Sequence, residues 1–210
     1  MKKCILSIML LAFAMSIAIA QDDEYQVKET KTVLGKNTKA RGFGSLDLKV
    51  SKFKNDHALL VGVHGGVILD NRFVLGLGGY GLTTNVDFEG TDPTGKQYLY
   101  GGYGGLVLGA VIAPREIVHI YIPVLIGAGG MEVTDQNYFQ GHFDSNYFSE
   151  SSAFFVVEPG VEIEINMTKF FKIGIGGSYR WIRESNLVNI TDNDLSNFSG
   201  QISFKFGSFR

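Results

Sequence analysis

Residues 156–180, VVEPGVEIEINMTKFFKIGIGGSYR, decide the fold. On both sides of the polar segment 166–169, apolar residues alternate with glycine, charged or other small residues. This period of two predicts two β-strands, 153–165 and 170–182, joined as a hairpin. Both exceed the roughly five or six residues of an ordinary globular strand, and they match the roughly nine to eleven that a tilted strand needs to cross a bilayer.

The same alternation recurs along the chain and predicts an all-β protein. We expect six further strands, at 42–50, 58–69, 73–82, 98–112, 117–128 and 198–206. The gaps 70–72, 113–116 and 166–169 are short, the gap 51–57 is modest, and the gaps 83–97, 129–152 and 183–197 are long and polar. This asymmetry predicts an eight-stranded antiparallel up-and-down transmembrane β-barrel with short periplasmic turns and long outer loops.

The hairpins test which side chains share a face of the sheet, because a register shift of one residue would move every side chain of a strand to the opposite face. We expect Leu69 opposite Phe73, Ile112 opposite Val118 and Ile165 opposite Phe171, which puts Glu164 opposite Lys172 on the other face. Aromatic residues near the strand ends predict girdles at the membrane interfaces. They are Tyr98, Tyr100, Phe154, Phe155, Phe170, Phe171, Tyr179, Trp181 and Phe209.

One face of the strands carries far more large apolar side chains than the interior of an eight-stranded barrel holds, so we expect that face to contact lipid. The opposite face is small or charged and should line the lumen. Its charged residues are Asp47, Lys49, Glu158, Glu162, Glu164, Lys172, Arg180 and Lys205. Because an unpaired buried ion costs several kcal/mol, we expect a structural network of salt bridges that closes the lumen. A proton or ion path is the alternative.

The first twenty residues predict a secretory signal peptide. A basic start is followed by an apolar run and by Ala18-Ile19-Ala20, which is a typical cleavage site. Residues 21–40 are polar and unpatterned, so we expect a flexible periplasmic leader before a barrel domain at 41–210. The single cysteine, Cys4, belongs to the expected signal, so the mature protein would have no disulfide.

Over residues 41–210, the chain resembles the small eight-stranded outer-membrane barrels of the OmpA and OmpX type, within the outer membrane protein beta-barrel domain family. The resemblance rests on 156–180 and on the terminal strand 199–209, SGQISFKFGSF. It implies a monomer in the outer membrane of a Gram-negative-type bacterium, in contact with lipids and lipopolysaccharide. Family members end on an aromatic residue that the barrel-assembly machinery reads. Here Arg210 follows Phe209, so Phe206 or Phe209 would be the equivalent.

Several segments resemble cofactor-binding or metal-binding motifs, but each lacks a residue or an element that the motif requires. Residues 90–97, GTDPTGKQ, approach a phosphate-binding loop, but Gln97 replaces the required hydroxyl. Residues 76–81 fit GxGxxG without a following helix. The four histidines lack metal-ligand spacing, and 192–194 only begins like a calcium loop. A net charge of −2 without a basic block also argues against nucleic acid. We therefore expect no cofactor and no metal.

These features favour a non-enzymatic outer-membrane barrel with a structural or surface-interaction role. Its loop 129–152, with Tyr138, Phe139, Phe143, Tyr147 and Phe148, would contact an external protein or glycan. Two alternatives stay open. One is a lipid-modifying barrel enzyme of the deacylase or lipase type that uses His142 with Asp144, or His119. The other is a soluble lipocalin-like carrier in the periplasm.

Overall fold

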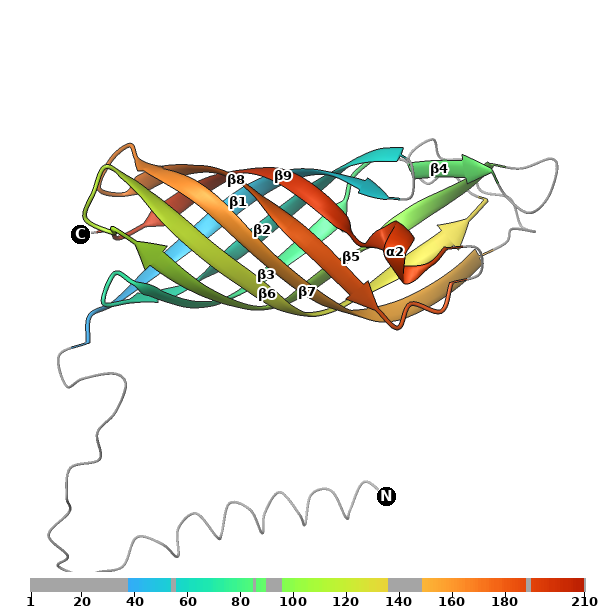
Figure 1. Ribbon diagram of the computed structural model, residues 1–210, viewed down its shortest axis with the longest axis horizontal. Helices are drawn as coiled ribbons and strands as arrows, with labels where there is room; N and C mark the ends of the chain where they lie inside the picture. Colours follow the sequence, from blue (N-terminus) through green and yellow to red (C-terminus); the bar gives the residue numbers. More distant parts are fainter. Residues whose placement is uncertain are drawn as a thin grey trace, which may run out of the picture. The chain divides into compact units, whose positions relative to one another are not determined.

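The computed structural model describes residues 38–53, 56–84, 86–89, 96–135, 149–187 and 190–209 (Figure 1). Eight antiparallel strands form a closed up-and-down barrel in which each strand pairs with its neighbours along the chain and β1 pairs with β9. These strands are β1 (Ala40–Phe53), β2 (Asp56–Leu69), β3 (Phe73–Leu82), β5 (Lys96–Ile112), β6 (Val118–Thr134), β7 (Ser149–Asn166), β8 (Phe171–Arg183) and β9 (Asn197–Gly207). The predicted fold is confirmed. The expected signal peptide and most of the expected leader lie outside the described residues.

An additional short strand, β4 (Val86–Glu89), lies inside the segment 83–97 that was predicted as a loop. It pairs with the first residues of β5. β5, β6 and β7 are also longer than expected, and all three extend at the end of the barrel that carries the long connections. We call this the loop end. The opposite end, with the connections 70–72, 113–117 and 167–170, is the turn end.

The three turn-end hairpins keep the expected facing, but two differ in register. Asp70 and Asn71 both have positive φ (50° and 62°), as a two-residue hairpin turn requires, and Leu69 faces Phe73 as predicted. By contrast, Ile112 pairs with Ile120 and Ile165 with Ile173, two residues beyond the expected partners Val118 and Phe171.

The local cause in the last hairpin is Thr168. Its Oγ1 accepts hydrogen bonds from the backbone N–H groups of Phe170 (3.2 Å) and Phe171 (2.9 Å) and holds a wider turn. As a result Glu164 lies opposite Gly174, and Lys172 lies opposite Asn166. The predicted pairing of Glu164 with Lys172 across the strands is therefore wrong in register, although their side chains still meet within the barrel.

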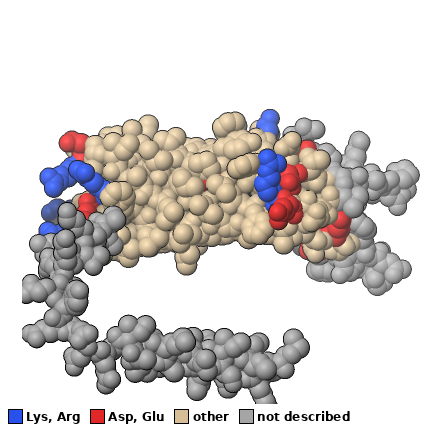
Figure 2. Space-filling view, turned by 60° about the horizontal axis from the view of Figure 1, so that its bottom comes forward, with Lys and Arg blue, Asp and Glu red and all other residues tan. Residues whose placement is uncertain are grey.

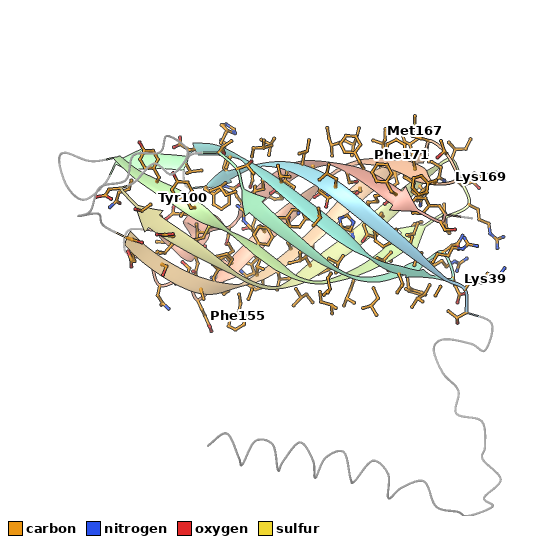
Figure 3. All side chains as sticks on the ribbon, turned by 180° about the vertical axis from the view of Figure 1, so that it is seen from behind. Lys39, Tyr100, Phe155, Met167, Lys169 and Phe171 are labelled. Carbon is orange, nitrogen blue, oxygen red and sulfur yellow. The ribbon has the colours of Figure 1, made fainter. Side chains whose placement is uncertain are left out.

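The outer surface is a belt of exposed apolar side chains between charged ends (Figure 2). Leu77 is 68% exposed and Phe198 is 74% exposed, values that no packed core would give. Phe155 points away from the barrel (Figure 3), as expected of a girdle residue. Two other predicted girdle residues point inward. Phe154 is only 2% exposed, and Phe209 packs against a small apolar cluster at the turn end. Among the described residues, no helix is long and apolar enough to cross a bilayer.

Candidate functional site: the charged lumen

All eight charged residues predicted for the lumen have buried side chains inside the barrel. They come from β1, β7, β8 and β9, four strands that are adjacent in the sheet. The order of the inward residues along β7 shows how deep in the barrel the charged residues lie. Glu164, Glu162 and Glu158 follow one another from the turn end, and the next inward residues, Val156 and Phe154, belong to an apolar cluster. On β7 the inward residues are therefore charged toward the turn end and apolar toward the loop end. A small apolar cluster of Ile68, Val74, Val111 and Tyr121 lies beside the charged groups at the turn end.

Glu164 is the centre of the charged group nearest the turn end. One of its oxygens accepts from Lys205 Nζ at 2.6 Å, and the other lies 2.7 Å from His119 Nε2 and 3.4 Å from Lys172 Nζ. Lys205 also reaches Glu162 at 3.0 Å and lies over the ring of Tyr121, 3.8 Å from its centroid. One lysine thus pairs with two buried carboxylates.

Glu162 completes its hydrogen bonding with uncharged groups of β9. Gln201 Nε2 donates to one carboxylate oxygen at 2.6 Å, and Ser203 Oγ donates to the other at 2.7 Å. A Cβ atom at Gly174 would lie only 2.5 Å from the Glu162 carboxylate, so glycine at this inward position makes room for the acid. Part of the glycine content of these strands follows from such close approaches.

Asp47 forms a second group with residues of β1, β2 and β3. Its carboxylate accepts from Ser45 Oγ at 2.7 Å and from Tyr80 OH at 3.0 Å, and it lies 2.5 Å from His64 Nδ1. A neighbouring pair links β1 to β7. Lys49 Nζ lies 2.7 Å from Glu158, and the ammonium also sits 3.4 Å from the centroid of the Tyr80 ring.

Glu158 has three short contacts with side chains of other strands or of its neighbour β8. Besides Lys49, it accepts from Ser178 Oγ at 2.5 Å and from Tyr103 OH at 2.6 Å. Charge-assisted hydrogen bonds of this kind are the strong ones, and three of them to one acid offset a large part of its desolvation cost.

Arg180 departs from the predicted pairing, because it forms no ion pair within the described part of the chain. Its guanidinium donates to the Leu195 carbonyl at 2.9 Å and, more weakly, to Ser51 Oγ at 3.3 Å. It also stacks on the Phe53 ring at 4.0 Å. The pairing of β7 with β8 skips Glu158 and Pro159, and Pro159 has no N–H to donate. The contacts with Ser51, Phe53 and Leu195 place the Arg180 guanidinium on the loop-end side of the acids.

The loop-end half of the lumen is filled by apolar side chains that the sequence analysis did not place inside. Leu60, Leu99, Met131 and Ile182 are each at most 2% exposed. The connection between β8 and β9 adds Leu187, Ile190 and Leu195 to the same cluster. This connection contains a short helix, α2 (Asp192–Leu195), and Arg180 Nε donates a hydrogen bond to the carbonyl of its last residue, Leu195. We call this apolar cluster, with the segment 184–196, the plug.

The residues that resembled the start of a calcium loop have structural partners instead. Asp194 and Thr191 close a capping box at the start of α2. The Asp192 carboxylate accepts from the backbone N–H groups of Glu184 (3.1 Å) and Ser185 (3.0 Å). Within the described ranges, no group of three His, Asp or Glu residues is arranged to hold a metal ion.

The candidate catalytic residues do not form a site in the described part of the chain. His119 is 2% exposed and belongs to the Glu164 group near the turn end, whereas a lipid-modifying site was expected at the outer rim. His142, Asp144 and the five loop aromatics at 138–148 lie outside the described residues, as do residues 90–95 of the phosphate-loop resemblance. The GxGxxG segment 76–81 lies within β3 and pairs with strands on both sides.

Sequence reasoning missed the histidine and tyrosine partners of the network. His64, Tyr80, Tyr103 and His119 all contact buried carboxylates. The signal was present, because each of them shares the inward parity of its strand. The long side chains of Tyr80 and Tyr103 reach acids on other strands, so pattern alone does not reveal their partners.

Comparisons with solved structures agree with this architecture. The crystal structure of Neisserial surface protein A (NspA) is similar with a TM-score of 0.50 at 11% identity, over 82% of this chain and 99% of that one. The N-terminal β-barrel domain of Pseudomonas aeruginosa OprF gives 0.46 at 11% identity, over 80% and 99%. Ail of Yersinia pestis gives 0.41 at 13% identity, over 80% and 95%. No protein-family model and no curated protein sequence matches the chain. The chain has the fold of the small eight-stranded outer-membrane barrels.

Proposed function

We propose that this protein is a non-enzymatic, monomeric outer-membrane barrel that acts through its loop end, with a lumen that conducts neither solutes nor ions. The observation that carries the proposal is the inversion of polarity across the strands. Exposed leucine, isoleucine, valine and phenylalanine form the outside, while lysine and glutamate are buried inside. In water this arrangement would be unstable, whereas in a bilayer it removes apolar surface from water and satisfies every strand edge.

The closed lumen is supported by two different seals in series. The turn-end half is crossed by direct ion pairs of 2.6–3.4 Å that join β7 to β1, β8 and β9. The loop-end half is closed by the plug. An eight-stranded barrel holds side chains and little else, so a pore would require both seals to be removed.

The same packing argues against the carrier alternative. Among the described residues, the lumenal cavity beside Lys49 and Glu158 has a volume of only about 20 Å³, whereas pockets for small organic ligands occupy about 300–1,000 Å³. A lipocalin-like carrier would also keep its apolar residues inside. Here the turn-end interior is ionic, which suits no lipid.

A role at the loop end is supported by the outward residues of the longest strands. On β7 the outward positions change from Ile163, Val161 and Phe155 to Ala153, Ser151 and Ser149 toward the loop end. The polar end of the strand therefore extends past the apolar belt into water. It carries the loop whose aromatic residues, at 138–148, we propose as the contact surface for an external protein or glycan and for lipopolysaccharide.

The location is tested by membrane fractionation combined with gel mobility before and after boiling. We expect outer-membrane fractionation and a folded form that migrates differently from the boiled chain. Trp181, the only tryptophan, is 46% exposed on the outer face, so quenchers confined to the lipid should reduce its emission. A chain that stays monodisperse in plain buffer, with Trp181 unquenched, would refute the proposal.

The closed lumen is tested separately, by single-channel recording in planar bilayers. We expect no discrete conductance from the intact barrel. A variant that lacks Lys49 and Glu158 together with the segment 184–196 removes parts of both seals and should show openings. Steady conductance from the unmodified protein would contradict the closed state while leaving the location intact.

A further inference from the structure

The lumenal cavity is lined by polar groups from both halves of the ionic network. Lys49, Tyr80 and His64 face it from the Asp47 side, and Glu158, Glu162 and Gln201 face it from the other side. The volume of this cavity, about 20 Å³, exceeds the roughly 10–15 Å³ that one water molecule needs. The cavity thus lies between the Asp47 group and the Glu162 group, beside the direct Lys49–Glu158 ion pair.

Two buried polar atoms of this lining have no hydrogen-bond partner among the described residues. They are Nε2 of His64 and Oε1 of Gln201. The residues are 6% and 7% exposed, and the other polar end of each is fixed by Asp47 and by Glu162 respectively. An unsatisfied buried polar atom costs about 1–3 kcal/mol, so a partner for both would stabilise the lumen.

The chemistry of the cavity selects the ligand. A metal cation would face the Lys49 ammonium, and an anion would face Glu158 and Glu162. The Asp47 carboxylate only accepts hydrogen bonds, so His64 Nδ1 donates to it and Nε2 is the ring atom left for another partner. Gln201 Oε1 is an acceptor. The cavity therefore suits a small neutral group that both donates and accepts hydrogen bonds.

We propose that this cavity is a binding site for one structural water molecule, which bridges His64 Nε2 and Gln201 Oε1 by hydrogen bonds. The water joins the Asp47 group to the Glu162 group. A hydrogen-bonded chain then runs from Asp47 through His64, the water, Gln201 and Glu162 to Lys205 and the Glu164 group near the turn end. This inference does not depend on the proposed loop-end role.

The direct test is nuclear magnetic resonance of the full chain in lipid nanodiscs, recording magnetisation transfer from long-lived water to the side chains of Gln201 and His64. We expect a cross-peak from both. Gln201→Met removes the acceptor at similar size and should abolish both signals. Ser45→Ala, a lumen substitution next to Asp47 but outside the cavity lining, should leave them unchanged.

A filling variant keeps the test decisive if Gln201→Met does not fold. Val107 lines the cavity, so Val107→Ile places a methyl group where the water would be. We expect loss of the cross-peaks and a lower unfolding temperature than for Val111→Ile, which adds the same methyl elsewhere in the lumen. A dry cavity would give the opposite sign, since filling it would raise the unfolding temperature. Absence of both cross-peaks in the unmodified protein would also overturn the proposal.

Discussion

The two halves of the lumen solve the same packing problem with opposite chemistry. Near the turn end, Glu164, Glu162 and Glu158 are buried with lysine, histidine and hydroxyl partners. Near the loop end, the inward residues of the same strand are Val156 and Phe154, each at most 2% exposed. On β7, alternation decides which side chains point inward, and depth along the barrel axis separates the ionic ones from the apolar ones.

The comparison predicts that shortening a buried side chain lowers the unfolding free energy by different amounts in the two halves. In the apolar half the substitution removes contacts and leaves a cavity. In the ionic half it leaves a buried partner with an uncompensated charge. The largest effect should therefore come from the ionic half, and specifically from the lysine that serves two acids.

Lys205→Met should have the largest effect, about 3–5 kcal/mol of unfolding free energy, because Glu162 and Glu164 both lose their shortest cationic contact. Urea unfolding of the barrel in lipid vesicles measures it. The matched control is Lys52→Met on the exposed face of β1, which should change stability by less than about 0.5 kcal/mol. Equal effects of the two substitutions would mean that the network contributes nothing specific.

Ile182→Ala probes the apolar half and should cost about 2–4 kcal/mol, because it removes a fully buried side chain from the plug and leaves a cavity. Ile175→Ala is the matched control on the same strand, where the side chain is 57% exposed on the lipid-facing side. Lipid can follow the truncated surface there, so the control should cost clearly less. A larger loss for Ile175→Ala would reverse the assignment of inside and outside.

Much of this architecture could be predicted from sequence because its determinants are local. Period-two alternation defines the strands, and the Asp70-Asn71 turn fixes the first turn-end hairpin, with Leu69 opposite Phe73. The inward position of Glu158 or Lys205 follows from the same parity. Closing the barrel adds only that these inward positions meet.

The rest depends on features that one strand does not carry. Thr168 widens a turn and shifts the β7–β8 register by two residues without changing the parity. Arg180 has the parity of a lumen cation, yet its partners are the Leu195 carbonyl and the Phe53 ring, which chain folding brings to that depth. The inward position of Phe154 was likewise missed, because an aromatic residue near a strand end fits both a girdle and a plug.

The pair Lys49–Glu158 tests whether the ionic half is needed for stability or could be apolar like the other half. Either single substitution to Met should destabilise more than the double variant, with a coupling energy of about 2 kcal/mol, because the double variant leaves no unpaired charge. A double-mutant cycle in urea measures it. Additive losses would show that Ser178 and Tyr103, and not Lys49, satisfy Glu158.

The smallest effect should come from Thr191→Ala, which removes the capping box of α2 and should cost about 1 kcal/mol. Hydrogen exchange should then accelerate at 192–196, because these amides depend on the local cap. The strand amides around Lys205 should keep their protection, since they belong to the ionic half. Thr191→Ser, which retains the hydroxyl acceptor, is the control. Faster exchange throughout β9 would show that the plug and the ionic network unfold as one unit and that the division of the lumen into two halves is structural only.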